Sequence, residues 1–360
     1  MLQYTLKRLL YGFLVLLGVI TLIFVLFNTL PGDPARMILG QRADLASVQA
    51  INRDLGRDKP LTVQYFNFLN DISPISVHNC ANSGSYWFLD PEKYASAIPL
   101  FNIGNAHLLV LKQPYLRRSY QSKRPVSEIL ADAFVPTIIL ATVAMLLATL
   151  AGLLIGIFSA LHKDTWFDKT ALLLSVLGMS LPSFFAAILI AWIFAFVLSD
   201  ITGLSMFGSL YSVDDFGNGE YISLKNLILP VFTLAIRPLA IITELTRSSM
   251  LDVLGQDYIR TARAKGLSER KIIVRHALKN AMNPVLTAVS GWFASLIAGA
   301  VFIEYVFDWK GIGVVIVDAL EKFDFPVVMG AVLCISVFLV IINILVDLAY
   351  GLLDPRIKYS

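Results

Sequence analysis

The chain alternates long apolar stretches with shorter polar segments, and this alternation sets its organisation. A helix that crosses a hydrocarbon core of about 30 Å needs about 20 consecutive apolar residues. Such stretches lie near residues 9–30, 133–161, 171–199, 227–246, 284–303 and 327–346. Because lipid offers no hydrogen bonds to an exposed backbone, stretches of this kind are helical. The pattern therefore predicts an all-α polytopic membrane protein with six transmembrane helices.

The first apolar stretch follows Lys7 and Arg8, an arrangement that also starts a secretory signal peptide. Its apolar run is longer than the ~7–15 residues of a signal-peptide core. It ends in Leu30-Pro-Gly-Asp-Pro34, which contains no small-x-small cleavage motif. Residues 1–30 are therefore predicted to form a retained transmembrane anchor.

Charge in the connecting segments predicts the orientation, because basic residues favour the cytoplasmic side in short loops. One set of segments carries Lys and Arg: the start with Lys7 and Arg8, the segment 162–170 with His162, Lys163 and Lys169, the loop 247–283, and the tail 352–360 with Arg356 and Lys358. The alternate loops 200–226 and 304–326 are acidic, the second beginning with Glu304. Both termini are thus predicted to be cytoplasmic.

The long segment 31–132 is predicted to be extracytoplasmic. Its first part, 31–70, has a helical spacing of apolar residues at Leu45, Val48, Ile51 and Leu55. Residues 71–115 show no clear period and are interpreted as an irregular surface insertion. Within it, His78 and His107 are predicted to be surface residues, because no partner at metal-ligand spacing accompanies either.

Composition supports the membrane setting and excludes several functions. Hydrophobic residues make up 57% of the chain and charged residues 15%, and the mean hydropathy is +0.71. The net charge of +3 argues against a nucleic-acid partner. In the predicted topology Cys80 lies outside the membrane and Cys334 within it, so no disulfide between them is expected. The chain has no Gly-x-x-x-x-Gly-Lys-Ser/Thr phosphate loop, so it is not predicted to hydrolyse ATP.

The loop 247–283 carries eight Lys or Arg against three acidic residues and has an amphipathic pattern. Residues at steps of three and four predict one apolar edge of a helix, next to an edge that carries Arg260 and Arg263. The residues of the apolar edge are Met250, Leu251, Leu254, Tyr258, Ala262 and Lys265. Gly266 is placed to end a helix in a left-handed conformation, and Ser268 to cap a second one that continues until Pro284 opens the next span. Two interpretations stay open here: a lever on which a soluble protein docks, or an interfacial helix whose arginines contact anionic lipid.

A resemblance decides between them. The stretch Asp257–Leu267, followed by Arg275–Ala281 and Pro284, resembles the cytoplasmic coupling loop (the EAA loop) of binding-protein-dependent ABC importer permeases, in the form of the dipeptide, oligopeptide and nickel branch. Similar to the same branch are Leu30–Pro34, Arg124–Val126, Gly311–Gly313, Phe325-Pro326 and the ending Asp347–Arg356. The Glu-Ala-Ala of the superfamily is Arg260-Thr261-Ala262 here, and Asn283 replaces an apolar residue before the proline.

The resemblance implies a type I ABC importer transmembrane fold with its core at 133–351, in the cytoplasmic membrane of a prokaryote. It implies a permease subunit that imports peptides, or alternatively nickel chelates or another small solute. The implied partners are a second permease, two ATPase subunits that use ATP, and an extracytoplasmic solute-binding protein; no cofactor or metal is expected on this chain. The implied coupling residues are Asp257, Tyr258, Ile259, Arg260, Thr261, Ala262, Arg263, Ala264, Lys265, Gly266 and Leu267.

Two charged residues lie within the predicted fourth span, where a lone arginine costs about 2.5–3.5 kcal/mol. Arg237 precedes Pro238, and Glu244 lies two turns further on, on roughly the same face. Arg237 is either a cation of the translocation path, with Glu244 nearby, or a structural residue satisfied by carbonyls freed at Pro238. Gly152 and Gly156 are predicted to allow close packing of helices. Pro136 and Pro182 are predicted to kink a helix or to start one.

Other classes of membrane protein fit less well. A secondary transporter is expected to show internal repeats and acidic residues inside the membrane, yet the first, second, third and fifth predicted spans contain no acid. A membrane-bound enzyme needs a convergent catalytic set, and the four histidines are scattered along the chain.

Overall fold

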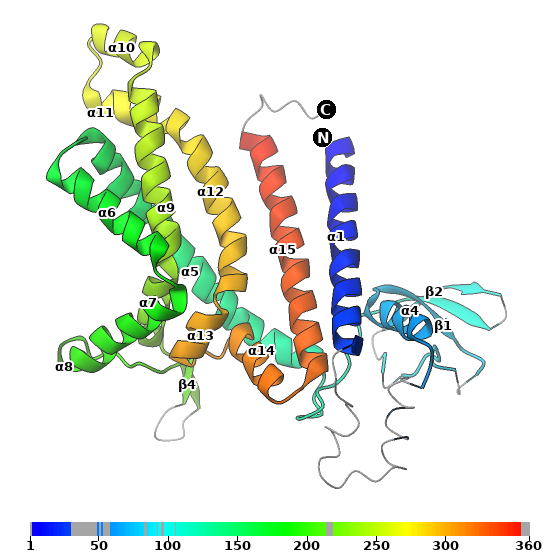
Figure 1. Cartoon of the computed structure of the whole chain (residues 1–360). Helices are drawn as coiled ribbons and strands as arrows, with labels where there is room; N and C mark the ends of the chain where they lie inside the picture. The colour runs from blue at the N-terminus through cyan, green and yellow to red at the C-terminus, as the bar shows by residue number, and fades with distance from the viewer. Residues whose placement is uncertain are drawn as a thin grey trace. The chain divides into compact units, whose positions relative to one another are not determined.

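The computed structural model describes residues 2–29, 49, 52, 58–82, 85–91, 93–94, 97–104, 106–213 and 219–353. The helical spacing expected around Leu45 to Leu55 and the tail from residue 354 lie outside these residues. The chain divides into two compact units. Unit 1 comprises residues 1–131 and 318–340 with 359–360, and unit 2 comprises residues 132–317 and 341–358. Figure 1 colours the elements from blue to red along the chain.

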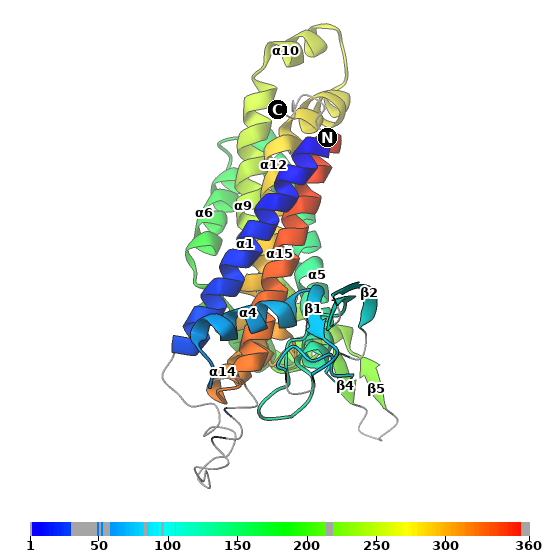
Figure 2. The ribbon, with the colours of Figure 1, turned by 90° about the vertical axis from the view of Figure 1, so that its right-hand side faces the viewer.

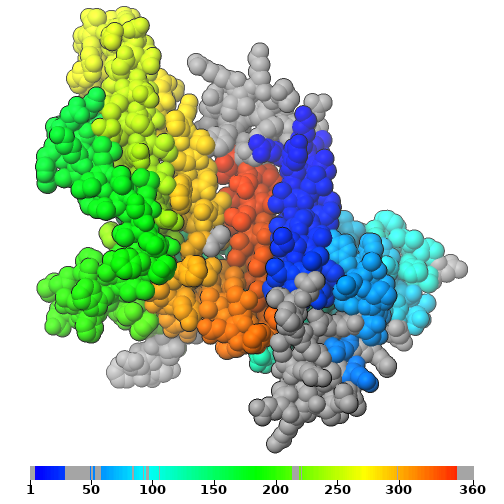
Figure 3. All heavy atoms as spheres, viewed as in Figure 1, coloured from blue at the N-terminus to red at the C-terminus, as the bar shows by residue number. Residues whose placement is uncertain are grey.

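Four described helices are long and apolar enough to cross a membrane. They are α1 (Leu2–Thr29), α5 (Val126–Leu161), α9 (Ile228–Leu254, preceded by the 3-10 turn Leu224–Leu227) and α15 (Phe325–Leu353). Two bent helix pairs raise the number to six if each pair forms one span. Figure 3 shows the side chains of α1, in blue, exposed along one face of the molecule, as expected of a lipid-facing helix.

The predicted third span is not one helix. It consists of α6 (Trp166–Ser180) and α7 (Ser183–Ile190), which continues as a π-helical segment to Val197, and the two parts meet at 110°. The bend lies at Leu181 and Pro182, both in extended conformations. Proline disfavours a helical conformation in the residue before it and cannot donate a helical hydrogen bond, so α6 ends there and α7 starts anew. The prediction that Pro182 kinks or starts a helix is confirmed.

The other bent pair forms the predicted fifth span. Here α12 (Leu278–Gly299) is followed by α13 (Val301–Phe307) at 54°. Glu304 was predicted to lie in an acidic loop, but it is a fully buried residue of α13. Its carboxylate accepts hydrogen bonds from the Thr137 hydroxyl at 2.6 Å and the Gly313 amide at 2.7 Å, at the start of α14 (Ile312–Glu321). These donors compensate the loss of water around the buried group.

Close helix packing in unit 2 depends on two glycines of α5. A Cβ at Gly156 would lie 2.6 Å from the Thr246 Cβ, and one at Gly152 would lie 2.9 Å from a methyl carbon of Ile242. Both neighbours belong to α9, so the predicted packing role of this small-xxx-small pair is confirmed. At the far end of unit 2 lie α8 (Ser199–Thr202) and a hairpin of β4 (Tyr211–Val213) and β5 (Glu220–Ile222).

Unit 1 contains a small ordered subdomain in the region that was interpreted as irregular. Helix α4 (Leu61–Ile72) precedes an antiparallel sheet of order β1-β3-β2, formed by β1 (Ile75–Asn79), β2 (Ile98–Ile103) and β3 (His107–Leu111). The interpretation of 71–115 as irregular was therefore wrong. His107 is exposed, as predicted, but His78 is fully buried.

The subdomain is built around a polar interior centred on Asp71, which is 1% exposed. Its carboxylate accepts hydrogen bonds from the Tyr94 hydroxyl at 2.6 Å, the Tyr86 hydroxyl at 3.1 Å and Lys93 Nζ at 3.2 Å. Burial, with Asp71 nearby, raises the pKa of both tyrosines. Burial also lowers the pKa of Lys112 to about 8 and, together with Lys112, that of His78 to about 4.

Candidate coupling loop and translocation cavity

The predicted coupling residues form a helical hairpin at one end of unit 2. Beyond α9 the chain turns into α10 (Asp257–Ala264) and then α11 (Glu269–Lys271), and a π-helical segment, Ile272–Ala277, leads into α12. Figures 1 and 2 show α10 at the tip of α9, beyond the other helices of the unit. Pro284 lies inside α12, so the expectation that it opens the span was wrong.

The turn of the hairpin depends on Gly266, whose φ of +72° confirms the predicted left-handed conformation. Its amide donates to the Arg263 carbonyl at 2.9 Å, and the Leu267 amide to the Ala262 carbonyl at 3.3 Å, which closes α10. Ser268 is the N-cap residue of α11, as predicted, but its side chain makes no capping hydrogen bond. Glu269 instead accepts two hydrogen bonds from the Arg263 guanidinium, at 2.8 and 3.3 Å, across the turn.

The hairpin is anchored by a buried apolar edge. Ile259 is fully buried and Ala262 is 7% exposed, in a cluster with Met250 at the end of α9 and Ile272 after the turn. Gly255 and Gln256 interrupt the helix between Leu254 and Asp257. The prediction of one apolar edge from Met250 to Lys265 was therefore wrong in part, because Tyr258 and Lys265 are exposed. The Tyr258 hydroxyl accepts a hydrogen bond from the Asn280 amide at 2.8 Å.

Most of the hairpin's polar side chains remain exposed. Of the eleven predicted coupling residues, Ile259 and Ala262 are buried and Leu267 is half-buried, while the others are exposed. The ion pair between Arg260 and Asp257, at 3.3 Å, is fully open to solvent and contributes little to stability. The structure thus presents a rigid element with a free, largely cationic surface.

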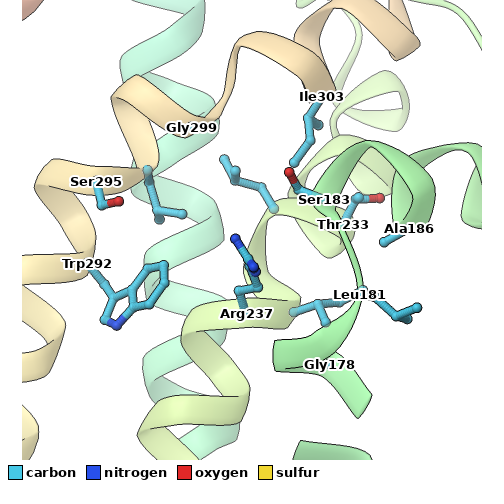
Figure 4. A pocket seen from close by; sticks show the side chains of 13 residues that line it. Gly178, Leu181, Ser183, Ala186, Thr233, Arg237, Trp292, Ser295, Gly299 and Ile303 are labelled. Atoms are coloured by element: carbon cyan, nitrogen blue, oxygen red, sulfur yellow. The ribbon is translucent and has the colours of Figure 1, made fainter. Parts of the chain in front are cut away.

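A cavity lies in unit 2 beside Arg237, between α9, α12, α13 and the break that separates α6 from α7. Among the described residues that line it, Arg237 is the only charged one, and Thr233, Ser183, Ser295 and Trp292 are polar or aromatic neighbours. Figure 4 shows the Arg237 side chain extending between Trp292 and Ser295 on one side and the start of α7 on the other. Glu244 is exposed and is not part of this lining.

Within the described part of the chain, Arg237 makes one weak hydrogen bond, from Nη2 to the Met179 carbonyl at 3.4 Å. That carbonyl belongs to the last turn of α6, not to a turn freed at Pro238. Helix α9 runs through Pro238 without ending, so the expected break at this residue was wrong. The two roles considered for Arg237 in the sequence, structural and in the translocation path, therefore both stay predictions.

Comparison with known families now identifies the chain's relatives. A model of the binding-protein-dependent transport system inner membrane component matches residues 152–359, and a model of the N-terminal region of such membrane components matches residues 1–84. The chain belongs to this family of inner membrane permeases. The first match contains the entire hairpin and the cavity, and the second contains α1, α4 and β1.

Two permeases illustrate the full-length similarity. The glutathione transport system permease protein GsiC of Salmonella choleraesuis is 35% identical over 360 residues, and the dipeptide transport system permease protein DppB of Alkalihalophilus pseudofirmus is 34% identical over 375 residues; the alignments cover all of each chain. Among solved structures, an inward-facing methionine ABC transporter, MetNI, is similar at 16% identity with a TM-score of 0.51, covering 63% of this chain and 97% of that chain. This similarity concerns the fold alone.

The permease also contains a buried ion pair that sequence reasoning missed. Arg247, near the end of α9, donates from Nε and Nη2 to the Asp168 carboxylate at 2.5 and 2.7 Å. Asp168 is 1% exposed and also accepts hydrogen bonds from the Ser159 hydroxyl and, at 2.9 Å, the Asp164 amide. The pair holds the segment 162–170 at the same end of unit 2 as the hairpin. The available signal was a short loop with two acids, Asp164 and Asp168, and an arginine at the end of a span.

Proposed function

We propose that this permease is one of two membrane subunits of an ATP-driven importer of peptides, coupled to cytoplasmic ATPase subunits through residues 257–267. The names of its relatives, a glutathione and a dipeptide permease, support the substrate class. Nickel chelates remain the alternative cargo. The observation that carries the proposal is the exposed hairpin, anchored on its own stem by Ile259 and Ala262.

The hairpin is suited to transmit movement along α9. Met250 packs beneath it, and the same uninterrupted helix carries Arg237 in the cavity. Because a packed helix moves as a rigid element, displacement of α10 by an ATPase shifts the wall of the cavity. The free polar surface of α10 provides the contact for that subunit.

The proposed assembly places the hairpin in the cytoplasm. The segment 162–170, with Lys163 and Lys169, and the basic loop 247–283 share one end of unit 2, joined by the Asp168–Arg247 pair. The opposite end holds the acidic loop 200–226, whose Gly208 amide donates to the Phe307 carbonyl at 3.1 Å. This distribution supports a cytoplasmic hairpin and an extracytoplasmic surface for a solute-binding protein.

Substitution at Gly266 tests the coupling role. A Cβ at Gly266 would meet nothing within 4 Å, so a new side chain acts only through the positive φ. Gly266→Val should distort the turn, since a left-handed conformation costs about 1–2 kcal/mol for an L-residue, whereas Gly266→Asn should be tolerated. We expect the valine variant to stay in the membrane but to lose ATPase binding and uptake in proteoliposomes. Full ATP-driven uptake by Gly266→Val would contradict the assignment.

We further propose that Arg237 meets the carboxylate of the cargo in the cavity. Of the described lining residues it alone is charged, and the one hydrogen bond that it makes to a described residue is weak and goes to a carbonyl. Arg237 is exposed, and a guanidinium can hold a carboxylate through two parallel hydrogen bonds. Peptides with a free C-terminus supply that group.

The matched cargo for this test is a peptide and its C-terminal amide. Arg237→Gln keeps donors but removes the charge, so it should slow uptake of the free acid selectively. Binding of both peptides to the solute-binding protein is measured separately, which removes its own preference from the comparison. An equal proportional loss for both peptides would contradict the carboxylate role while leaving the peptide-import function intact.

A further inference from the structure

The three-stranded sheet of unit 1 has an apolar face that no described residue covers. Register pairs Ile75 with Leu111 and Leu111 with Ile98, and these side chains are 57%, 41% and 58% exposed. Two residues along, Val77 and Leu109 continue the same face, and Leu109 pairs with Phe101 after a bulge in β2. Phe101 is 59% exposed. The face thus forms an apolar ladder across all three strands.

The opposite face of the sheet is already filled where β1 and β3 form it. Ser76, His78, Val110 and Lys112 alternate with the ladder residues and are all buried, against the polar interior around Asp71. Since the side-chain period of a strand is two, the inward set cannot also supply the ladder. The exposed ladder therefore requires an apolar environment from outside the subdomain.

The attachment of α4 shows the depth at which the subdomain lies. Tyr65 of α4 shares a hydrogen bond of 2.6 Å with Thr21, and Phe68 and Ile72 cluster with Ile20 and Phe24 of α1. These α1 residues lie inside the apolar span Thr5–Asn28, about four to eight residues before its end, or about 6–12 Å along the axis at ~1.5 Å per residue. Figures 1 and 2 show α4 beside α1, short of the end of that helix.

Contacts of α4 with a second transmembrane helix, α15, give the same depth of α4 within the apolar span. The α4 cluster also contacts Met329 and Leu333 of α15, whose apolar span starts at Phe325. These positions again lie about 6–12 Å inside the span. A hydrocarbon core of about 30 Å occupies ~20 residues, so spans of 24 and 22 residues extend only slightly beyond it. The contacts of α4 therefore reach below the boundary of the hydrocarbon core.

We infer that α4 and the sheet, residues 61–111, form a membrane-interface subdomain whose apolar ladder contacts the acyl chains of the leaflet in which α1 ends. The ladder carries no charged side chain, and α4 adds exposed Leu61, Val63 and Phe66. Apolar faces of interfacial elements enter about 5–10 Å into the boundary region, which matches the depth of the α4 contacts. Strand β2 lies at an edge of the sheet, and an edge strand leaves a row of backbone groups unpaired on one side, so the sheet stays at the interface and does not enter the core.

Spin labels on single cysteines test this inference in the full-length permease in lipid nanodiscs. In a background of Cys80→Ser and Cys334→Ser, labels are placed at Ile75→Cys, Ile98→Cys and Phe101→Cys. Leu22→Cys on α1, 63% exposed, is the lipid reference, and Ser122→Cys in an exposed loop is the water reference. All of these side chains are exposed, so the substitutions should not disturb packing.

At each position, the collision rate of the spin label with oxygen, which concentrates in lipid, is compared with its collision rate with the polar complex Ni(II)EDDA, which stays in water. We expect the logarithm of the oxygen-to-nickel accessibility ratio to be positive at the three ladder positions, as at Leu22→Cys, and negative at Ser122→Cys. A negative value at the ladder positions would place the sheet in water and overturn the inference. Low accessibility to both reagents would overturn it as well, because it would show a protein partner on the face.

Discussion

The buried pair between Arg247 and Asp168 offers the sharpest test of how this permease supports its coupling hairpin. In Arg247→Met the long apolar side chain fills much of the same space, but the guanidinium that neutralises Asp168 is lost. The carboxylate would keep two donors, the Ser159 hydroxyl and the Asp164 amide, at a site that is 1% exposed. An unpaired charge in such a site is strongly unfavourable, and the end of α9 loses its attachment to the start of α6.

Removing one partner of a buried ion pair costs about 3–5 kcal/mol. For a domain of this size about 1 kcal/mol shifts the Tm by roughly 2–4 °C, so the variant should melt about 6–20 °C below the parent. The control is Arg260→Met, which breaks the Arg260–Asp257 pair, whose side chains are 73% and 95% exposed. An exposed pair contributes at most about 1 kcal/mol, so this control should melt within a few degrees of the parent.

Thermal unfolding of the purified permease in detergent, followed by the loss of monodisperse protein on size-exclusion chromatography, measures the difference. The double variant Arg247→Met with Asp168→Asn removes the stranded charge, so it should recover part of the lost stability. The reasoning fails if Arg247→Met and Arg260→Met melt together. It also fails if the double variant is less stable than Arg247→Met alone.

Two further predictions concern packing and pH. Gly156→Val should destabilise the protein by about 1–3 kcal/mol, because a Cβ there would lie 2.6 Å from the Cβ of Thr246. Gly18→Val, which places the new side chain in open space on α1, should not destabilise it. Equal abundance in membranes and equal Tm for the two variants would contradict this prediction. The pKa of His78 is about 4 in the fold but near ~6.5 in an unfolded chain, so between these pH values the unfolded state binds more protons than the folded state. The contribution of His78 to the free energy of unfolding is therefore fully present above pH ~6.5. It falls by up to about 1.4 kcal/mol per pH unit as the pH falls toward 4. Amide exchange of β1 to β3, corrected for intrinsic rates, should therefore be faster at pH 5 than at pH 7, and in His78→Gln this difference should vanish; unchanged protection of the parent at pH 5 would refute it.

The apolar pattern predicted where the chain crosses the membrane but not how straight each crossing is. Four of the six expected spans are single helices, because length and hydropathy suffice for a helix surrounded by lipid or by other helices. The Pro182 break was predictable in kind, since proline disfavours helix in the residue before it. Its angle of 110° depends on what α7 packs against, which no local pattern contains.

The coupling hairpin was predictable for the same local reasons. The positive φ of Gly266 and the start of α11 after Ser268 follow from the residues of the turn. What the pattern could not supply was tertiary: which edge of α10 is buried, and that Arg247 pairs with Asp168 across a separation of 79 positions. Amphipathic spacing pointed to Tyr258, whereas the stem buries Ile259, because the interruption at Gly255 rotates α10 relative to α9.

The sheet was missed because the pattern of β1 is inverted and that of β3 does not alternate. In β1 the inward residues are Ser76 and His78 and the outward ones Ile75 and Val77, whereas β3 is a short apolar run, residues 108–111, followed by the buried Lys112. A rule that places only apolar residues inside does not find an interior that contains Ser76, His78 and Lys112. The polar interior is stable because each group has a partner around Asp71, and a fully satisfied polar network tolerates burial. Strands with apolar residues outside and polar residues inside are the pattern of barrels in lipid. The inversion that hides this subdomain in the sequence is therefore itself an argument for the lipid contact inferred from the depth of α4.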